Sequence, residues 1–165
     1  MRKPVSFAVE LVILCWLALS TTVPAQSQQS APADHGMFTP AAIQWKDGPA
    51  AVPPGAKWAV LEGDPAKEGP FTIRLSLPAG YKVPPHWHPN IEHTTVISGT
   101  LNLGMGDKFD KTAGTKLPAG SFSFVPPKTN HFVWTEEGCV LQVHSIGPWG
   151  IVYLNPADDP RPPKK

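Results

Sequence analysis

Short apolar runs separated by turn-forming residues make up the chain from Ile43 onward. The clearest run, residues 71–77, alternates apolar and polar side chains, which is typical of a strand with one buried face. No stretch of a dozen residues keeps the i, i+3, i+4, i+7 spacing of an amphipathic helix. A turn at Ser98 and Gly99 is expected to separate the fourth strand from the fifth. We expect strands at residues 57–62, 71–77, 83–88, 92–98, 100–105, 121–125, 131–135, 140–146 and 150–154.

This many short strands in roughly 110 residues predicts an all-β fold, an antiparallel sandwich or barrel in one domain. Composition agrees, because 21 Pro and 14 Gly in 165 residues supply turns and 41% hydrophobic residues suffice for a core. The 16% share of charged residues argues against a coiled coil and against disorder. The net charge is +1 and basic residues form no stripe, so we expect no nucleic-acid partner.

The first 25 residues have the pattern of a secretory signal peptide. Arg2 and Lys3 precede an apolar stretch, residues 7–19, that is too short to span a bilayer. Glu10 within it leaves an uncleaved anchor as the alternative. We expect cleavage after Ala25, a periplasmic or secreted location, and no membrane contact after cleavage.

The rest of the chain divides by composition into a flexible leader at 26–40, the β-barrel domain at 41–156 and a solvated tail at 157–165. Residues 106–116 are expected to be a polar connector or a lid. After cleavage Cys139 is the one cysteine left and cannot form an internal disulfide, so we interpret it as a buried apolar residue. The domain must then rely on its core, a bound metal or a subunit partner, and a homodimer stays open.

Four of the six histidines fall between residues 86 and 131. Side chains alternate along a strand, so His86 and His88 point to the same face. The Pro-Asn turn that follows is expected to bring Glu92 beside them, and His131 begins a later strand. Three imidazoles and one carboxylate form a ligand set suited to Mn, Fe, Co, Ni, Cu or Zn.

At these residues the sequence resembles the cupin superfamily. Its first motif is Gly, five residues, His-x-His, three or four residues, Glu, six residues, Gly. This motif is met in full by Gly80, His86, His88, Glu92 and Gly99.

The second cupin motif is Gly, five residues, Pro-x-Gly, two residues, His, three residues, Asn. It is met at Gly120, Pro126 and His131. It departs at Lys128, where the family has glycine, and at Thr135, where the family has asparagine. Glycine at the first of these positions mainly serves the backbone, so the departure affects the turn more than the ligand.

The resemblance implies a double-stranded β-helix of the jelly-roll type in which His86, His88, Glu92 and His131 hold one divalent transition metal: Fe, Mn, Ni, Cu or Zn. His93 is the rival of Glu92, but only one of two neighbours on a strand faces the barrel axis. Glu92 keeps the six-residue gap to the motif glycine, so His93 is expected on the outer face. A metal-free barrel with a polar lining remains the alternative.

The same resemblance implies a small-molecule ligand or substrate, and three functions follow. We favour a dioxygenase-like oxidation, as in the quercetin-type cupin dioxygenases. The alternatives are Lewis-acid isomerase, lyase or hydrolase chemistry and a barrel that only binds a small molecule or a metal. In the Lewis-acid route metal-bound water is the base. An acid or base beside the ligands would favour this route, and the candidates are Tyr81, His144 and Glu62.

Overall fold

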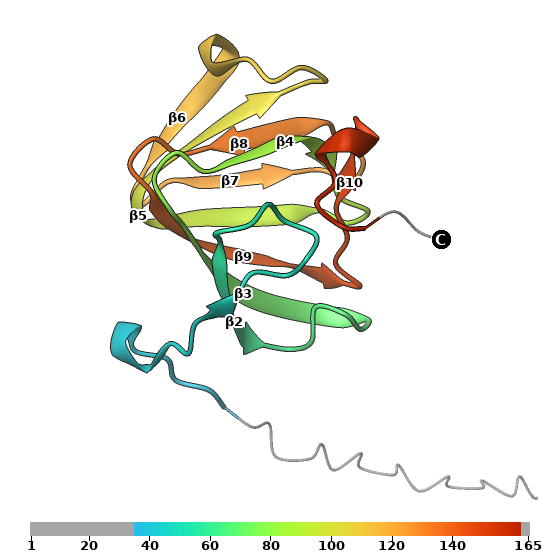
Figure 1. Cartoon of the computed structure of the whole chain (residues 1–165). Helices are drawn as coiled ribbons and strands as arrows, with labels where there is room; N and C mark the ends of the chain where they lie inside the picture. The colour runs from blue at the N-terminus through green and yellow to red at the C-terminus, as the bar shows by residue number, and fades with distance from the viewer. Residues whose placement is uncertain (1–34, 163–165) are drawn as a thin grey trace, which may run out of the picture. The chain divides into compact units, whose positions relative to one another are not determined.

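The computed structural model describes residues 35–162, which fold into ten β-strands and three short 3₁₀ helices (Figure 1). Within these residues no helix has the length and apolar character needed to cross a membrane. The helices are η1 (Pro40–Ala42), η2 (Lys111–Ala113) and η3 (Pro156–Asp158). The strands are β1 (Lys46–Asp47), β2 (Lys57–Glu62), β3 (Gly69–Leu77), β4 (Lys82–Trp87), β5 (Glu92–Met105), β6 (Gly114–Pro118), β7 (Phe122–Val125), β8 (His131–Trp134), β9 (Cys139–Gly147) and β10 (Val152–Tyr153).

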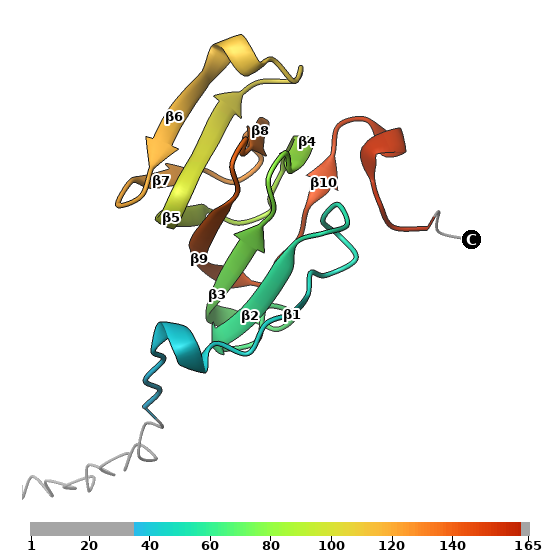
Figure 2. The same cartoon turned by 60° about the vertical axis from the view of Figure 1, so that its left-hand side comes forward.

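Every pairing between these strands is antiparallel. They form one curled sheet in the order β1-β2-β3-β9-β5-β8-β4-β10, and β6 and β7 also pair with β5. In Figures 1 and 2 the sheet curls from β2 and β3 towards β4 and β8, so that one concave face encloses the interior. The predicted all-β class and antiparallel barrel type are confirmed.

Strand β5 joins the two walls of the curled sheet. Its first half pairs with β7 and β9, and its second half with β6 and β8. The expected turn at Ser98 and Gly99 is therefore wrong, because the chain bends there without reversing. A register shift between Val96 and Ser98 and a φ of +71° at Gly99 provide the bend.

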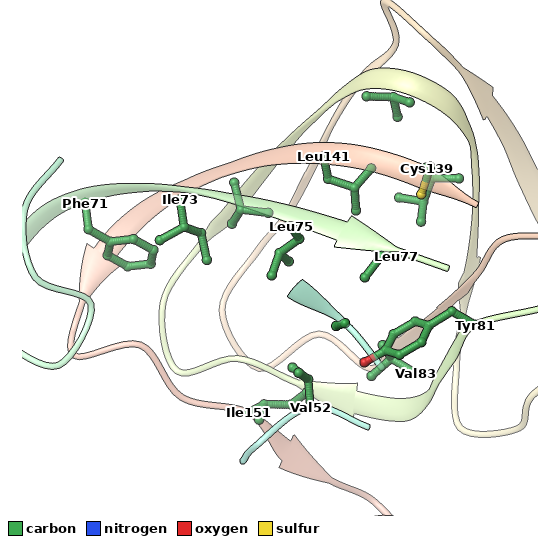
Figure 3. Close-up of a cluster of buried hydrophobic side chains, with 14 of the residues drawn as sticks. Val52, Phe71, Ile73, Leu75, Leu77, Tyr81, Val83, Cys139, Leu141 and Ile151 are labelled. Carbon is green, nitrogen blue, oxygen red and sulfur yellow. The ribbon is translucent and has the colours of Figure 1, made fainter. Parts of the chain in front are cut away.

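The core lies on the concave face and follows from alternation along the strands. On β3 the side chains of Phe71, Ile73, Leu75 and Leu77 are buried, while those between them are partly exposed. Figure 3 shows these four in a row, with Val83 and Ile151 facing them from across the interior. Each such side chain contributes about 1.5–3 kcal/mol when fully buried.

Cys139 belongs to the same cluster, as the interpretation of it as an apolar residue requires. Burial raises the pKa of its thiol to about 11, which keeps it protonated at neutral pH.

Two strands were missed by the sequence pattern. β1 has two residues, and β6 has one partly buried apolar side chain, Leu117, so neither shows an alternation long enough to detect. β6 begins within the expected connector at residues 106–116. Another residue of that segment, Phe109, packs against Phe132 and Trp134 at ring-centroid distances of 5.1 and 5.6 Å.

The expected signal peptide and most of the expected leader lie outside the described residues. Between Lys46 and Tyr153 the strands fall within the expected barrel domain at 41–156. Beyond them, in the segment expected to be a solvated tail, Arg161 donates a hydrogen bond of 3.0 Å to the Ile151 carbonyl. This bond attaches the described end of the tail to the barrel.

Candidate metal centre

Three histidines meet on the concave face from strands that lie side by side. His86 is on β4 and His131 opens β8, and the two are direct partners across the strand pair. His88 follows the end of β4 and, as alternation predicted, lies on the same side as His86. The ring centroids are 4.2 Å apart for His86 and His131, 4.9 Å for His86 and His88, and 5.2 Å for His88 and His131.

A backbone carbonyl orients each of the three rings through its Nδ1 atom. His86 Nδ1 lies 2.7 Å from the Pro84 oxygen, His131 Nδ1 lies 2.9 Å from the Thr129 oxygen, and His88 Nδ1 lies 2.7 Å from the Gly150 oxygen. A carbonyl only accepts, so each Nδ1 carries the hydrogen and donates it. In a neutral imidazole this leaves Nε2 as a free acceptor or ligand atom.

The free nitrogens converge. One ligand atom from each ring lies within 4.8 Å of the other two, and all three side chains are buried. The Nε2 atoms of His88 and His131 are buried and have no hydrogen-bond partner in the described structure. Buried polar atoms normally have a partner, so two orphaned acceptors pointing to one centre fit a bound cation.

Glu92 stands at the edge of this cluster, at the start of β5. Its Oε1 atom lies 3.5 Å from His88 Nε2, and its Oε2 atom lies 3.9 Å from His131 Nε2. Its side chain is 14% exposed, whereas those of His88 and His131 are 4% and 1% exposed. The structure thus brings all four expected residues together, with the three histidines forming the tight group and the carboxylate beside it.

The electrostatics of the cluster favour the neutral form of His86 and His131. Burial lowers the pKa of His86 well below its usual value, and the neighbouring His131 and His88 lower it further. Burial also lowers the pKa of His131, although Glu92 and the Thr129 carbonyl oppose the shift. Neutral imidazole is the form that binds metal, so these two rings are prepared as ligands at neutral pH.

His93 and His144 lie on the opposite, outer face. They are direct partners between β5 and β9, and their rings stack at 4.6 Å with an interplanar angle of 6°. Phe122, which is 55% exposed, stacks on His93 from the neighbouring strand. Because Glu92 faces the cluster and His93 faces away, the carboxylate is the ligand candidate of the two.

An apolar cavity opens beside the histidine cluster. Of the three candidate acid–base residues, only Tyr81 lines this cavity. Glu62 and His144 lie on the outer side of the sheet, where the Glu62 carboxylate accepts a hydrogen bond from the Thr72 hydroxyl. The Tyr81 hydroxyl donates a hydrogen bond of 2.6 Å to the Pro53 carbonyl, and burial raises the pKa of this hydroxyl. It is therefore held as a structural donor.

Sequence reasoning did not assign two further residues to this site. Thr94 lines the cavity two positions after Glu92, so strand parity could have found it. Trp149 also lines the cavity, and its ring stacks on His88 at 5.8 Å and 16°. It lies in the loop after β9, where no periodic signal places a side chain.

Comparison with known proteins gives a family and a set of similar folds. A family model described as the ChrR cupin-like domain matches residues 34–147. No curated protein sequence matches the chain.

Three solved structures illustrate the similarity of fold. The polyketide cyclase RemF from Streptomyces resistomycificus is 16% identical with a TM-score of 0.62, over 77% of this chain and 90% of that one. A proposed acetylacetone dioxygenase from Methylibium petroleiphilum PM1 is 18% identical with a TM-score of 0.59, over 80% and 89%. The DMSP lyase DddQ from Ruegeria pomeroyi DSS-3 is 21% identical with a TM-score of 0.55, over 70% and 63%.

Proposed function

The chain belongs to the family of ChrR cupin-like domains, and on that basis we propose that it binds one divalent transition metal and oxidises a small organic substrate with dioxygen. The ligands in this proposal are His86, His88, His131 and Glu92. The observation that carries it is the convergence of buried imidazoles whose Nδ1 atoms are all engaged by carbonyls, while two Nε2 atoms have no partner.

The residues of the chain have distinct tasks in this proposal. The three imidazoles supply neutral nitrogen donors in fixed orientations, and Glu92 supplies one negative charge. A redox-active ion such as Fe, Mn, Ni or Cu, when bound, provides the centre at which substrate and dioxygen react. The apolar side chains around the cluster exclude bulk water from it.

The surroundings of the cluster favour oxidation over Lewis-acid chemistry. A free acid or base within reach of the substrate would favour isomerase, lyase or hydrolase chemistry beyond what metal-bound water supplies. Tyr81 already donates to Pro53, and the other two candidates lie on outer positions. The named neighbours include both a proposed dioxygenase and a lyase, so their fold supports either class.

The proposal also places the protein outside the cytoplasm. Residues 1–25 would direct export and be removed, so the mature chain would begin at Gln26. Mass spectrometry of the protein recovered from the periplasm or medium gives the mature N-terminus directly.

Oxygen uptake tests the proposed reaction. Protein reconstituted with Fe(II), Mn, Ni or Cu is mixed with small diketones and phenols in an oxygen electrode. We expect substrate-dependent uptake that is lost in His131→Ala and kept in His144→Ala, because only the first residue belongs to the cluster. Turnover without oxygen uptake would instead support the Lewis-acid alternative, and metal-loaded protein without turnover would support the binding alternative.

A further inference from the structure

Ten of the seventeen residues that line the cavity beside the histidine cluster are aliphatic. They come from β3, β4, β5, β8 and β9, from the segment before β2 and from the loop between β9 and β10. The cavity has a volume of about 50 Å³, which limits its occupant to a small molecule. The apolar lining residues are Val52, Ala56, Leu75, Leu77, Val83, Leu101, Val133, Leu141, Val143 and Ile151.

Charged groups are scarce in this lining. Apart from the three histidines, the lining residues with polar side chains are Tyr81, Glu92, Thr94 and Trp149, and none of the lining residues is Lys or Arg. The Tyr81 hydroxyl is already committed to the Pro53 carbonyl. A negatively charged ligand would therefore find no cation here other than a bound metal ion.

The charges present limit the charge of the ligand. A divalent ion held by three neutral imidazoles and the Glu92 carboxylate carries a net charge of +1. A ligand with a single negative charge neutralises that centre. A ligand with two negative charges leaves one of them unpaired among aliphatic side chains, which is costly in a medium of low dielectric constant.

We propose, building on the function proposed above, that the ligand of this cavity is a small molecule with an apolar body, oxygen donors at one end and one negative charge when bound. Enolates of diketones, phenolates and apolar monocarboxylates belong to this class. Dicarboxylates, phosphates and amines do not, because the lining offers neither a second cation nor an anion beyond Glu92.

Two ligands with the same spacing of oxygen donors test the inference. Pentane-2,4-dione and malonate can both chelate a metal through two oxygens that are separated by three carbons. The first binds as a singly charged enolate with apolar ends, releasing one proton to the buffer, and the second is a dianion. Binding to the full chain loaded with Co(II) is followed by titration calorimetry and by the shift of the cobalt absorption bands.

We expect the dione to bind at least 10-fold more tightly than malonate at the same pH. Equal or tighter binding of malonate by fully loaded protein would overturn this inference while leaving the metal site intact. Protein that takes up no Co(II) would overturn the proposed function and this inference together. The metal content of each sample separates the two results.

A matched pair of variants tests whether the lack of a Lys or Arg side chain in the lining sets the preference for singly charged ligands. Val133 lines the cavity but is only partly buried, so a longer side chain can extend towards its mouth. Val133→Lys should improve malonate binding relative to dione binding about 10-fold, while Val133→Met, which adds length without charge, should keep the wild-type preference. An unchanged preference in folded, metal-loaded Val133→Lys would count against the inference. If that variant does not fold, the comparison of the two ligands on wild-type protein decides.

Discussion

His88 differs from the other two histidines of the cluster in what holds its ring. His86 and His131 donate to carbonyls two residues earlier in the chain, so their orientation is local. His88 donates to the Gly150 carbonyl, 62 residues away in the loop after β9. The orientation of this one ligand therefore depends on a distant loop.

Asn90 is a side chain that holds the start of that loop near His88. Its amide Nδ2 donates to the Ile146 carbonyl near the end of β9 at 2.8 Å and lies 3.5 Å from the Pro148 carbonyl in the loop. Asn90→Ala removes this bond and should weaken Co(II) affinity about 10-fold, since partners that orient metal ligands commonly matter by that amount. Equilibrium dialysis measures the affinity. Gln142→Ala, which removes a bond to Arg74 far from the cluster, is the control and should leave the affinity unchanged.

At the residue scale the sequence motif predicted the ligand cluster well, but it did not predict all the hydrogen bonds that orient the ligands. The spacing of His86, His88 and Glu92 was sufficient because strand alternation fixes which side chains share a face. Lys128 departs from the motif glycine yet adopts a φ of +57°, so the turn before His131 has a left-handed backbone of the kind that glycine adopts readily. Gly150 could not be predicted, because the contact comes from a loop without periodicity.

At the scale of elements, β5 determines whether the sheet can curl. The strand passes from one wall to the other at Gly99, where φ is positive and the backbone lies against the Gly138 carbonyl. A Cβ atom at this position would overlap that oxygen. The bend therefore needs a residue without a side chain.

Gly99→Ala should lower the free energy of unfolding by roughly 2–4 kcal/mol, because it adds a steric overlap to an unfavourable φ. Gly106, just after the same strand, also has a positive φ, but a Cβ there would meet nothing within 4 Å. Gly106→Ala should cost only about 1–2 kcal/mol. Urea denaturation of both variants gives the two values, and equal losses would show that the bend at Gly99 tolerates a side chain.

The turn that was wrongly predicted within β5 has a physical cause that local sequence does not reveal. Ser98 and Gly99 have the composition of a turn, but a glycine with positive φ serves a bend within a strand equally well. Which of the two forms depends on strand pairing with β8 and β9, which local sequence does not contain. Strands such as β2 and β3, which carry their own alternation, were predicted nearly residue for residue.

At the scale of the whole molecule, the stability of the fold depends on pH, because protonating the buried imidazoles of His86 and His131 destabilises the folded state. The folded-state pKa values of His86 and His131 lie below the ordinary value of 6.5. As the pH drops below 6.5, the unfolded chain binds protons at these positions before the folded chain does. The free energy of unfolding therefore decreases as the pH decreases. Above pH 6.5 both states are neutral there and the contribution is complete.

The metal-free protein should therefore have a constant melting temperature above about pH 6.5 and a falling one between pH 6.5 and 5. Calorimetric melting in this range, after treatment with a chelator, measures the effect. The His86→Gln/His131→Gln variant should show a flatter profile. His144, whose pKa burial also lowers, is tested separately by His144→Gln, which should retain most of the wild-type slope. An equal slope in the wild type and the double variant would contradict the assignment.

Elemental analysis of the purified protein tests the metal centre most directly. Three samples are compared: the wild type, the His86→Ala/His131→Ala variant of the cluster, and the His93→Ala/His144→Ala variant of the outer face. We predict about one transition-metal ion per chain in the wild type and in the outer-face variant, and none in the cluster variant. Equal metal content in the cluster variant and the wild type, or no metal in any folded sample offered the ion, would contradict the account.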